Sequence, residues 1–191
     1  VFFGTFRTSL GGSLVSQTGL GDSYQMYFVF SSTGNTAAGG GGSIDGTFNS
    51  FEYTIYLDPG FNTTLSNPSM GVANEQVVRG GTTSDDIAVL AGTLETGGFH
   101  IFSGLANGDF NVLANAAAIG DFFGGAAFAT GVARTDINGV NSSVMGVSPA
   151  NPFGDTTDIL INGSGNTSFE PVPVPEPASL ALFGLALAGV A

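Results

Sequence analysis

The sequence predicts an all-β fold, an antiparallel β-sandwich, and three observations support it. Gly occupies 31 of the 191 positions, and Asn, Ser and Thr are also common, which is typical of short strands joined by many turns. Good helix formers are scarce, because the chain has no Lys and few Gln, Glu or Arg residues. Apolar segments separated by Gly or Asn recur about every ten residues, which fits a sandwich better than a βαβ pattern.

The composition also excludes several classes of function. Only 9% of the residues are charged, against about 25% in an ordinary soluble domain, while 42% are hydrophobic, so the chain is not disordered by composition. The basic residues are Arg7, Arg79 and Arg134, and the net charge is −12. A nucleic-acid-binding protein needs a cationic surface, so this class is excluded. Without Cys, the chain forms neither disulfides nor thiolate metal sites.

Two segments, 24–30 and 51–57, predict strands most clearly. In the second, large apolar residues occur at every other position, which is the period of a half-buried strand. This apolar set consists of Phe51, Tyr53, Ile55 and Leu57. The four glycines at 39–42 cannot hold a regular strand, so we expect a mobile loop there.

The remaining strands follow in order along the chain. Residues 114–119, rich in Ala, predict one turn of helix. The other predicted strands are residues 86–94, 99–103, 109–113, 126–134, 158–163 and 166–172. Together these elements predict one sandwich domain over residues 1–170.

The C-terminal part of the sequence differs in composition from the rest of the chain. Residues 171–177 contain four prolines, which predict an extended linker. Residues 178–191 carry no charge, and they form a short apolar segment that is expected to be helical or packed against another surface. A helix of 14 residues rises about 21 Å, less than the roughly 30 Å of a bilayer core. Either the encoded chain continues past Ala191, or this segment is buried in something other than a bilayer.

One short motif carries a resemblance to a known family. Val174, Pro175, Glu176 and Pro177, followed by the apolar segment, resemble the PEP-CTERM sorting signal of Gram-negative bacteria that make exopolysaccharide. The resemblance implies recognition by an exosortase, cleavage near the motif and transient membrane contact through 178–191. It also implies a location outside the cell or on its outer surface. The Arg-rich end of the family pattern is missing here.

Three further segments are similar to the flocculation-associated PEP-CTERM proteins. These segments are residues 24–36, 46–60 and 161–177. The resemblance implies that the protein helps cells to aggregate through the extracellular matrix. It brings no catalytic residues with it.

The sequence offers few residues for chemistry. His100 is the one histidine, and it alternates with apolar neighbours, which favours packing or exposure over catalysis. We therefore expect no catalytic residue, no cofactor-binding residue and no enzyme activity. Oxygen-bearing side chains surround Gly139 at Asp136, Asn138 and Asn141, which makes them weak candidates for Ca²⁺, although a simple turn is favoured. The pair Asp85 and Asp86 is expected in a solvated loop.

These observations lead to two hypotheses about function. In the first, the protein is an exported structural subunit that associates with its own copies, into filaments, and promotes aggregation, flocculation or biofilm formation. The apolar end of one copy, or residues 168–174, would then pack on the next copy. In the alternative, a monomeric surface module binds exopolysaccharide through exposed Tyr24, Tyr27 and Tyr56.

Overall fold

The computed structural model describes residues 2–3, 19–66, 78–102, 108–120, 122, 133–148 and 158–171, to which all structural statements refer. The strands are β1 (Gln25–Ala38), β2 (Ile44–Asp58), β3 (Thr63–Ser66), β4 (Val78–Gly81), β5 (Ile87–Ile101), β6 (Gly108–Ala118), β7 (Ala133–Ser148) and β8 (Asp158–Pro171). A short 3-10 turn, η1 (Gly40–Gly42), lies within the glycine run that was predicted as a loop. The all-β, antiparallel class is therefore confirmed. None of the described helical segments has the length and apolar character needed to cross a membrane.

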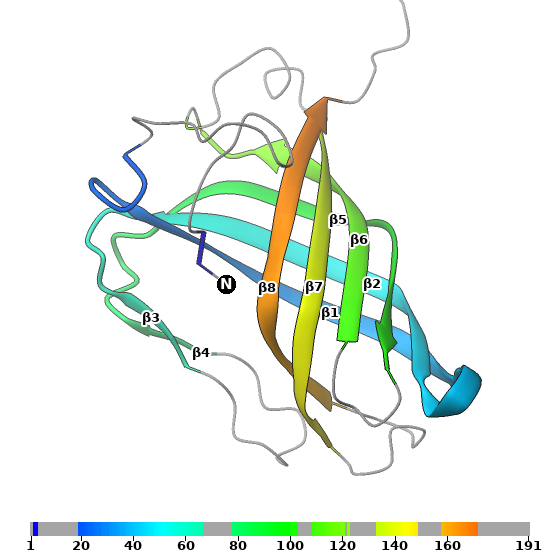
Figure 1. The fold of residues 1–191 in the computed structure, drawn as a ribbon. Coiled ribbons are helices and arrows are strands. Elements are labelled where there is room, and N and C mark those ends of the chain that lie inside the picture. The colour runs from blue at the N-terminus through cyan, green and yellow to red at the C-terminus, as the bar shows by residue number, and fades with distance from the viewer. Residues whose placement is uncertain are drawn as a thin grey trace, which may run out of the picture.

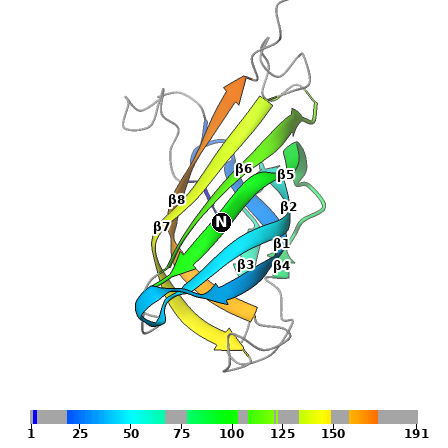
Figure 2. The same ribbon diagram turned by 90° about the vertical axis from the view of Figure 1, so that its right-hand side faces the viewer.

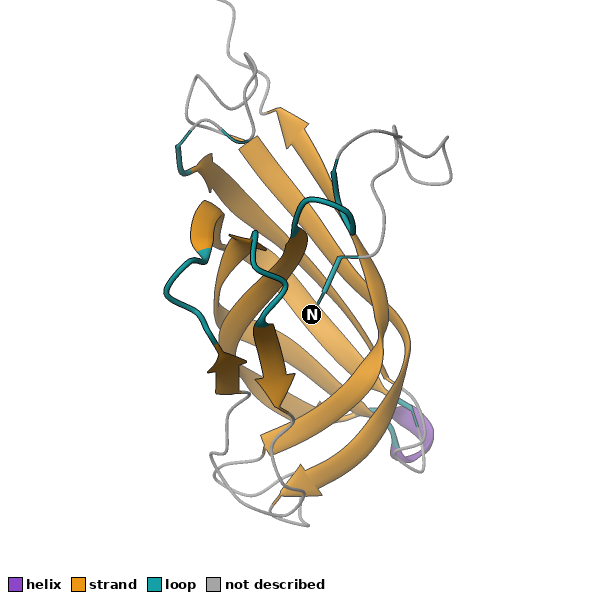
Figure 3. Ribbon diagram, turned by 90° about the vertical axis from the view of Figure 1, so that its left-hand side faces the viewer, coloured by secondary structure: helices purple, strands orange, loops and turns teal. Residues whose placement is uncertain are grey.

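Six strands form one continuous antiparallel sheet in the order β1-β2-β5-β6-β7-β8, and β3 and β4 form a separate hairpin (Figure 1). The large sheet curls strongly, so that β7 and β8 pass in front of β1 and β2 in Figure 1, and Figures 2 and 3 show the same curl from the two sides. Phe30 on β1 and Phe110 on β6 have ring centroids 6.3 Å apart, although β2 and β5 separate their strands. The two layers expected of a sandwich thus come from one curled sheet.

The inner face of the curled sheet holds the hydrophobic core. The predicted period of two in β2 is confirmed, because all four members of its apolar set are buried. Side chains of four other strands complete the same cluster. These are Met26 of β1, Val89 and Leu90 of β5, Val112, Ala114 and Ala116 of β6, and Ile137 of β7.

Two pairs of predicted strands are single strands in the structure. The predicted strands 86–94 and 99–103 merge into one strand, β5 (Ile87–Ile101), since Gly97 and Gly98 stay paired with β6 between them, and residue 103 lies outside the described residues. The predicted strands 158–163 and 166–172 likewise merge into β8, which ends at Pro171, and residue 172 lies outside the described residues. A Cβ on Gly97 would lie 2.7 Å from the carbonyl oxygen of Asn111, so glycine here permits a close backbone approach instead of ending the strand.

The predicted helical turn at residues 114–119 was wrong. Residues 114–118 continue β6, with Ala114 and Ala116 buried and Ala118 paired with Leu90 of β5. Pairing on both sides of the strand outweighs the weak helix propensity of a short Ala-rich run. Of the predicted strand 126–134, only Ala133 and Arg134 are described, and they begin β7.

Tyr53 connects strands that are not neighbours in the sheet. Its hydroxyl lies 2.7 Å from the hydroxyl of Thr135 on β7, and it donates to the carbonyl oxygen of Asn115 on β6 at 3.2 Å. The ring passes over β5 at Gly92, its cross-strand partner, where a side chain would overlap the Asn115 carbonyl and the ring. Burial raises the pKa of Tyr53 to about 12.

We predict that Gly92→Ala destabilises the domain by about 2–3 kcal/mol, because the new methyl group overlaps both the backbone of β6 and the Tyr53 ring. Gly40→Ala is the matched control, since its Cβ would meet no atom within 4 Å, and it should change stability by no more than about 0.5 kcal/mol. Urea denaturation measures both variants. Equal stability of the two would contradict the crossing of Tyr53 over Gly92.

Candidate functional site

The densest polar cluster among the described residues lies where the β3–β4 hairpin meets the large sheet. Its centre is Asp58, the last residue of β2, which begins the Asp-Pro-Gly turn and is fully buried. One carboxylate oxygen accepts from the Gly60 N–H at 2.9 Å. The other accepts from the Gln25 amide at 2.6 Å and from the N–H groups of Asn62 and Thr63 at 3.1 and 2.9 Å. Asp58 therefore shapes the turn after β2 and holds the first residue of β3.

Asp58 is held in its ionised form by these donors. Burial alone would raise the pKa of the carboxyl group, but the hydrogen bonds from Gln25, Thr63, Gly60 and Asn62 together lower the pKa below its usual value. A buried carboxylate with this many donors stabilises the fold only while it stays charged.

Asp86 and Tyr27 form the second part of the cluster. The Tyr27 hydroxyl donates to Asp86 at 2.5 Å, and the Thr63 hydroxyl also donates to this carboxylate, 3.0 Å from each of its oxygens. Arg79 of β4 donates to the Tyr27 oxygen at 3.3 Å, and its guanidinium lies 4.5 Å above the Tyr56 ring. Burial and the bond to Asp86 raise the pKa of Tyr27. The cluster thus ties β4 and the segment before β5 to β1.

The predicted exposure of Tyr24 and Tyr27 was wrong. Their exposed fractions are 9% and 0%. Tyr27 is buried because its hydroxyl has a partner in Asp86 and its ring stacks on Tyr56, with centroids 5.3 Å apart. Tyr24 packs edge-on against Phe122. Tyr56 is half-buried beneath Arg79, so these three side chains do not form an exposed aromatic face.

Three carboxylates in this cluster could hold a cation. One oxygen atom from each of Asp58, Asp85 and Asp86 lies within 4.8 Å of the others, and carboxylate oxygens are ligands that Ca²⁺ prefers. Asp85 Oδ1 is buried without a hydrogen-bond partner, while its Oδ2 accepts from Asn62 at 3.3 Å. The oxygens of Asp58 and Asp86, however, already accept protein hydrogen bonds. The cluster as it stands fastens the hairpin, and sequence reasoning missed it because Asp85 and Asp86 were assigned to a solvated loop.

The predicted calcium candidates lie on a strand and not in a turn. Asp136 and Asn138 share one face of β7, and the carboxylate of Asp136 accepts from the amides of Asn138 and Asn111 at 2.8 and 3.2 Å. Asn111 of β6 also donates to Asn138. Both amides donate to the same carboxylate oxygen, Oδ1, and a cation at these residues stays a prediction. The side chain of Asn141 lies outside the described residues.

His100 forms a cross-strand pair on the outer part of the sheet. Its Nδ1 lies 2.5 Å from the carboxylate of Asp45, its partner on β2, and its ring packs edge-on against Phe102. The sequence favoured packing or exposure of this ring over catalysis, and the lack of a catalytic role stays a prediction. Neither partner supplies a nucleophile of the kind that a catalytic histidine activates.

The last strand leads directly into the predicted sorting motif. β8 pairs with β7 as far as Pro171, opposite Ala133, and only Val172 and Pro173 separate it from Val174. Comparison with protein families matches residues 173–191 to the PEP-CTERM protein-sorting motif. The chain carries a PEP-CTERM sorting signal. An exosortase is therefore its processing partner, and the protein is exported to the cell surface or beyond.

The sorting signal covers only the C-terminal end of the chain. The predicted sorting signal at the C-terminal end is thus confirmed over residues 173–191, whereas the form of the linker after Pro171 and of the apolar segment 178–191 lies outside the described residues. Neither a curated protein nor a solved structure matches this chain.

We predict that Asp58→Asn lowers the unfolding free energy by about 2–4 kcal/mol at neutral pH. In the variant an NH2 group replaces one of the two accepting oxygens, so at least one of the surrounding N–H donors loses its acceptor. The pKa of Asp58 is lowered in the folded state, so its contribution is complete above the unfolded pKa of about 3.9 and is lost as pH falls through the folded value. The variant should therefore show a flatter loss of stability in acid than the natural chain.

Asp22→Asn, in an exposed turn, is the control and should shift stability by no more than about 0.5 kcal/mol. Urea denaturation between neutral and acidic pH measures all three chains. An Asp58→Asn variant with the same acid dependence as the natural chain would show that this carboxylate is not the titrating group.

Proposed function

We propose that this protein is a non-catalytic structural component of the extracellular matrix that associates with its own copies and promotes aggregation, flocculation or biofilm formation. The sorting signal supports its delivery to the cell exterior. The described side-chain clusters support a structural role, because their polar groups connect strands and fasten a hairpin. The similarity of residues 24–36 and 46–60 to flocculation-associated proteins points in the same direction.

The main support for this proposal comes from the two edge strands of the sheet, β1 and β8. Among the described strands, β1 and β8 each have one neighbour in the sheet, and each is 14 residues long. Residues 2–3 pair with β1 only near its beginning. β1 contains neither a charged residue nor a proline, and in β8 the charged residues Asp158 and Glu170 and the proline Pro171 all lie near the ends of the strand. Natural proteins usually protect long edges with charges or prolines, so these edges favour pairing with another chain.

The strand order makes the two edges complementary. Each of the six strands is antiparallel to its neighbour, so β1 and β8 run in opposite directions. If β8 of one copy adds to β1 of the next copy in the same orientation, the antiparallel alternation continues across the junction. Contacts of this head-to-tail kind do not close on themselves unless the rotation forms a ring, and they generate filaments.

The alternative is a monomeric surface module that binds exopolysaccharide. The burial of Tyr24 and Tyr27 removes two of the three aromatic side chains on which this hypothesis depended. We therefore prefer the self-associating subunit and keep polysaccharide binding as a separate outcome of the same experiment.

We predict that the exported protein forms filaments and that the double variant Ser31→Lys/Ala37→Lys stays monomeric. Both positions are exposed on β1 and lie opposite Glu52 and Asp45 of β2, so the folded domain accommodates the new charges while the edge repels another strand. Sedimentation velocity and electron microscopy of the protein collected outside the cell measure the outcome.

Asn49→Lys/Ala117→Lys is the matched control, because it adds the same charge at exposed positions on the central strands β2 and β6. This control should polymerise as the natural chain does. Filaments that persist in the Ser31→Lys/Ala37→Lys variant would contradict edge pairing. A natural chain that stays monomeric and binds polysaccharide would favour the alternative function.

A further inference from the structure

Exposed apolar side chains gather where the chain leaves the sheet for its sorting signal. β6 and β8 run in the same direction, because both are antiparallel to β7 between them. Pro171 at the end of β8 is level with Ala116 of β6, through Ala133 of β7. Ile119 follows Ala116 by three residues, and its N–H donates to the carbonyl oxygen of Val89. Because a strand rises about 3.3 Å per residue, Ile119 lies on the order of 10 Å beyond the end of β8. We call this end of the sheet, where β6 and β8 end and β5 begins, the exit end.

The exposed apolar side chains at the exit end include three that follow β6 or begin β5. Ile119 and Phe122, which follow β6, are 43% and 39% exposed, and Ile87 at the start of β5 is 54% exposed. Asp85 and Asp86 directly precede Ile87 in the sequence, and their carboxylates accept hydrogen bonds from Asn62, Thr63 and Tyr27.

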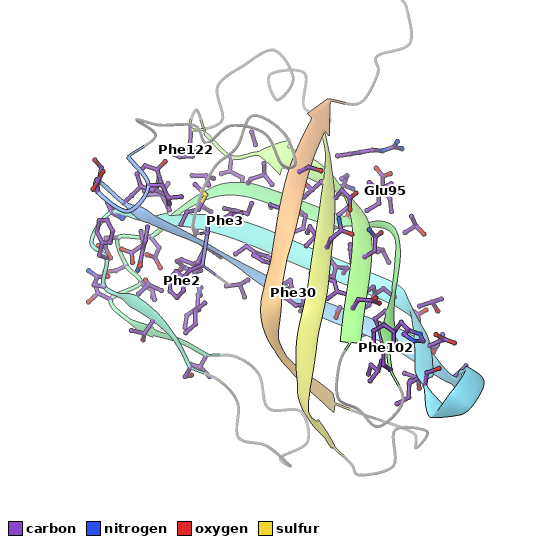
Figure 4. All side chains as sticks on the ribbon, in the orientation of Figure 1. Phe2, Phe3, Phe30, Glu95, Phe102 and Phe122 are labelled. Carbon is purple, nitrogen blue, oxygen red and sulfur yellow. The ribbon has the colours of Figure 1, made fainter. Side chains whose placement is uncertain are left out.

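The connection to the apolar segment is short. Residues 172–177 separate Pro171 from residue 178, and six residues span at most about 20 Å. Residues 178–191 carry no charge, so a lipid bilayer is a favourable environment for them. When this segment is buried in a bilayer, the exit end is held within about 20 Å of the lipid surface. The opposite end of the sheet, marked by Phe102 in Figure 4, faces the other way from Phe122.

We propose that Ile87, Ile119 and Phe122 form a second contact with the lipid surface, which holds the folded domain against the membrane while residues 178–191 are inserted. Aromatic and aliphatic side chains that enter the boundary between headgroups and acyl chains exchange contact with water for contact with lipid. The contact made by the three side chains and the insertion of residues 178–191 reinforce each other. The short connection keeps the three side chains at a high effective concentration near the lipid once the segment is inserted. The domain would then present the motif at Val174 to its processing enzyme in one orientation. This inference rests on the export part of the proposed function and does not require self-association.

The charge of the chain decides which lipid the surface prefers. The net charge of −12 repels an anionic bilayer, so the contact depends on the apolar side chains alone. We therefore expect stronger contact with phosphatidylcholine vesicles than with vesicles that also contain phosphatidylglycerol.

The absence of Trp from the sequence allows a direct test. Three single-Trp variants of the full chain, Phe122→Trp, Phe102→Trp and Phe183→Trp, are bound to phosphatidylcholine vesicles with brominated acyl chains, which quench Trp emission on contact. We expect strong quenching at position 183, partial quenching at 122 and none at 102, which is 47% exposed at the opposite end. Phosphatidylglycerol in the vesicles should reduce the quenching at 122.

Quenching at position 183 without quenching at 122 would overturn the proposal and leave export intact. No quenching at 183 would overturn it by removing its premise, independently of any result on filaments. Equal quenching at 102 and 122 would show that the domain touches lipid without a defined orientation, and this also contradicts the proposal.

A second set of variants tests the role of the neighbouring side chains. In the Phe122→Trp chain, Ile87→Ser/Ile119→Ser should abolish the quenching of the Trp, whereas Phe102→Ser should leave it unchanged. Thermal unfolding of each variant verifies that the domain is folded. Unchanged quenching in a folded Ile87→Ser/Ile119→Ser chain would overturn the assignment of these residues to the contact.

Discussion

The curl of the sheet depends on the contact of Tyr53 with Thr135 across Gly92. A side chain on β2 reaches β7 only if the sheet bends and if the strand between them offers no obstacle at the crossing point. Burying the ring contributes about 2–3 kcal/mol, and each hydrogen bond of its hydroxyl adds about 1 kcal/mol. A similar arrangement recurs where Phe99 covers Gly46 and Phe110 covers Gly139 on neighbouring strands. A single sheet can therefore enclose a core without a second sheet.

A sheet that curls without pairing its first and last strands has three distinct regions. The interior is filled by aromatic and aliphatic side chains, β1 and β8 each have one neighbour among the described strands, and the exit end carries both the hairpin cluster and exposed apolar side chains. The sorting signal follows β8 directly, so one edge strand also connects the domain to its export machinery. Export, stability and the proposed assembly therefore involve different residues, and single substitutions can separate them.

The features that were predicted correctly are local in the sequence. The alternation in residues 51–57 and the contiguous motif from Val174 to Pro177 needed no knowledge of distant residues. Where distant residues decide the structure, prediction failed. The hydroxyl of Tyr27 is bonded to Asp86, which is 59 residues away in the sequence, so its burial could not be predicted locally. The glycines within β5 resemble strand breaks in the sequence, but they allow a close approach of the neighbouring backbone. The Asp-Pro-Gly turn at Asp58 was visible, but its role in anchoring a hairpin was not.

The titration of the Tyr53 phenol tests the central claim most directly. NMR of the chain with labelled tyrosine rings follows all four tyrosines, and the Tyr53→Phe variant assigns the signal of interest. If Tyr53 is buried against Thr135 across Gly92, its ring stays neutral through the range in which an exposed tyrosine ionises and titrates at a pKa of about 12. Titration near the ordinary value of about 10 in a folded chain would contradict the account.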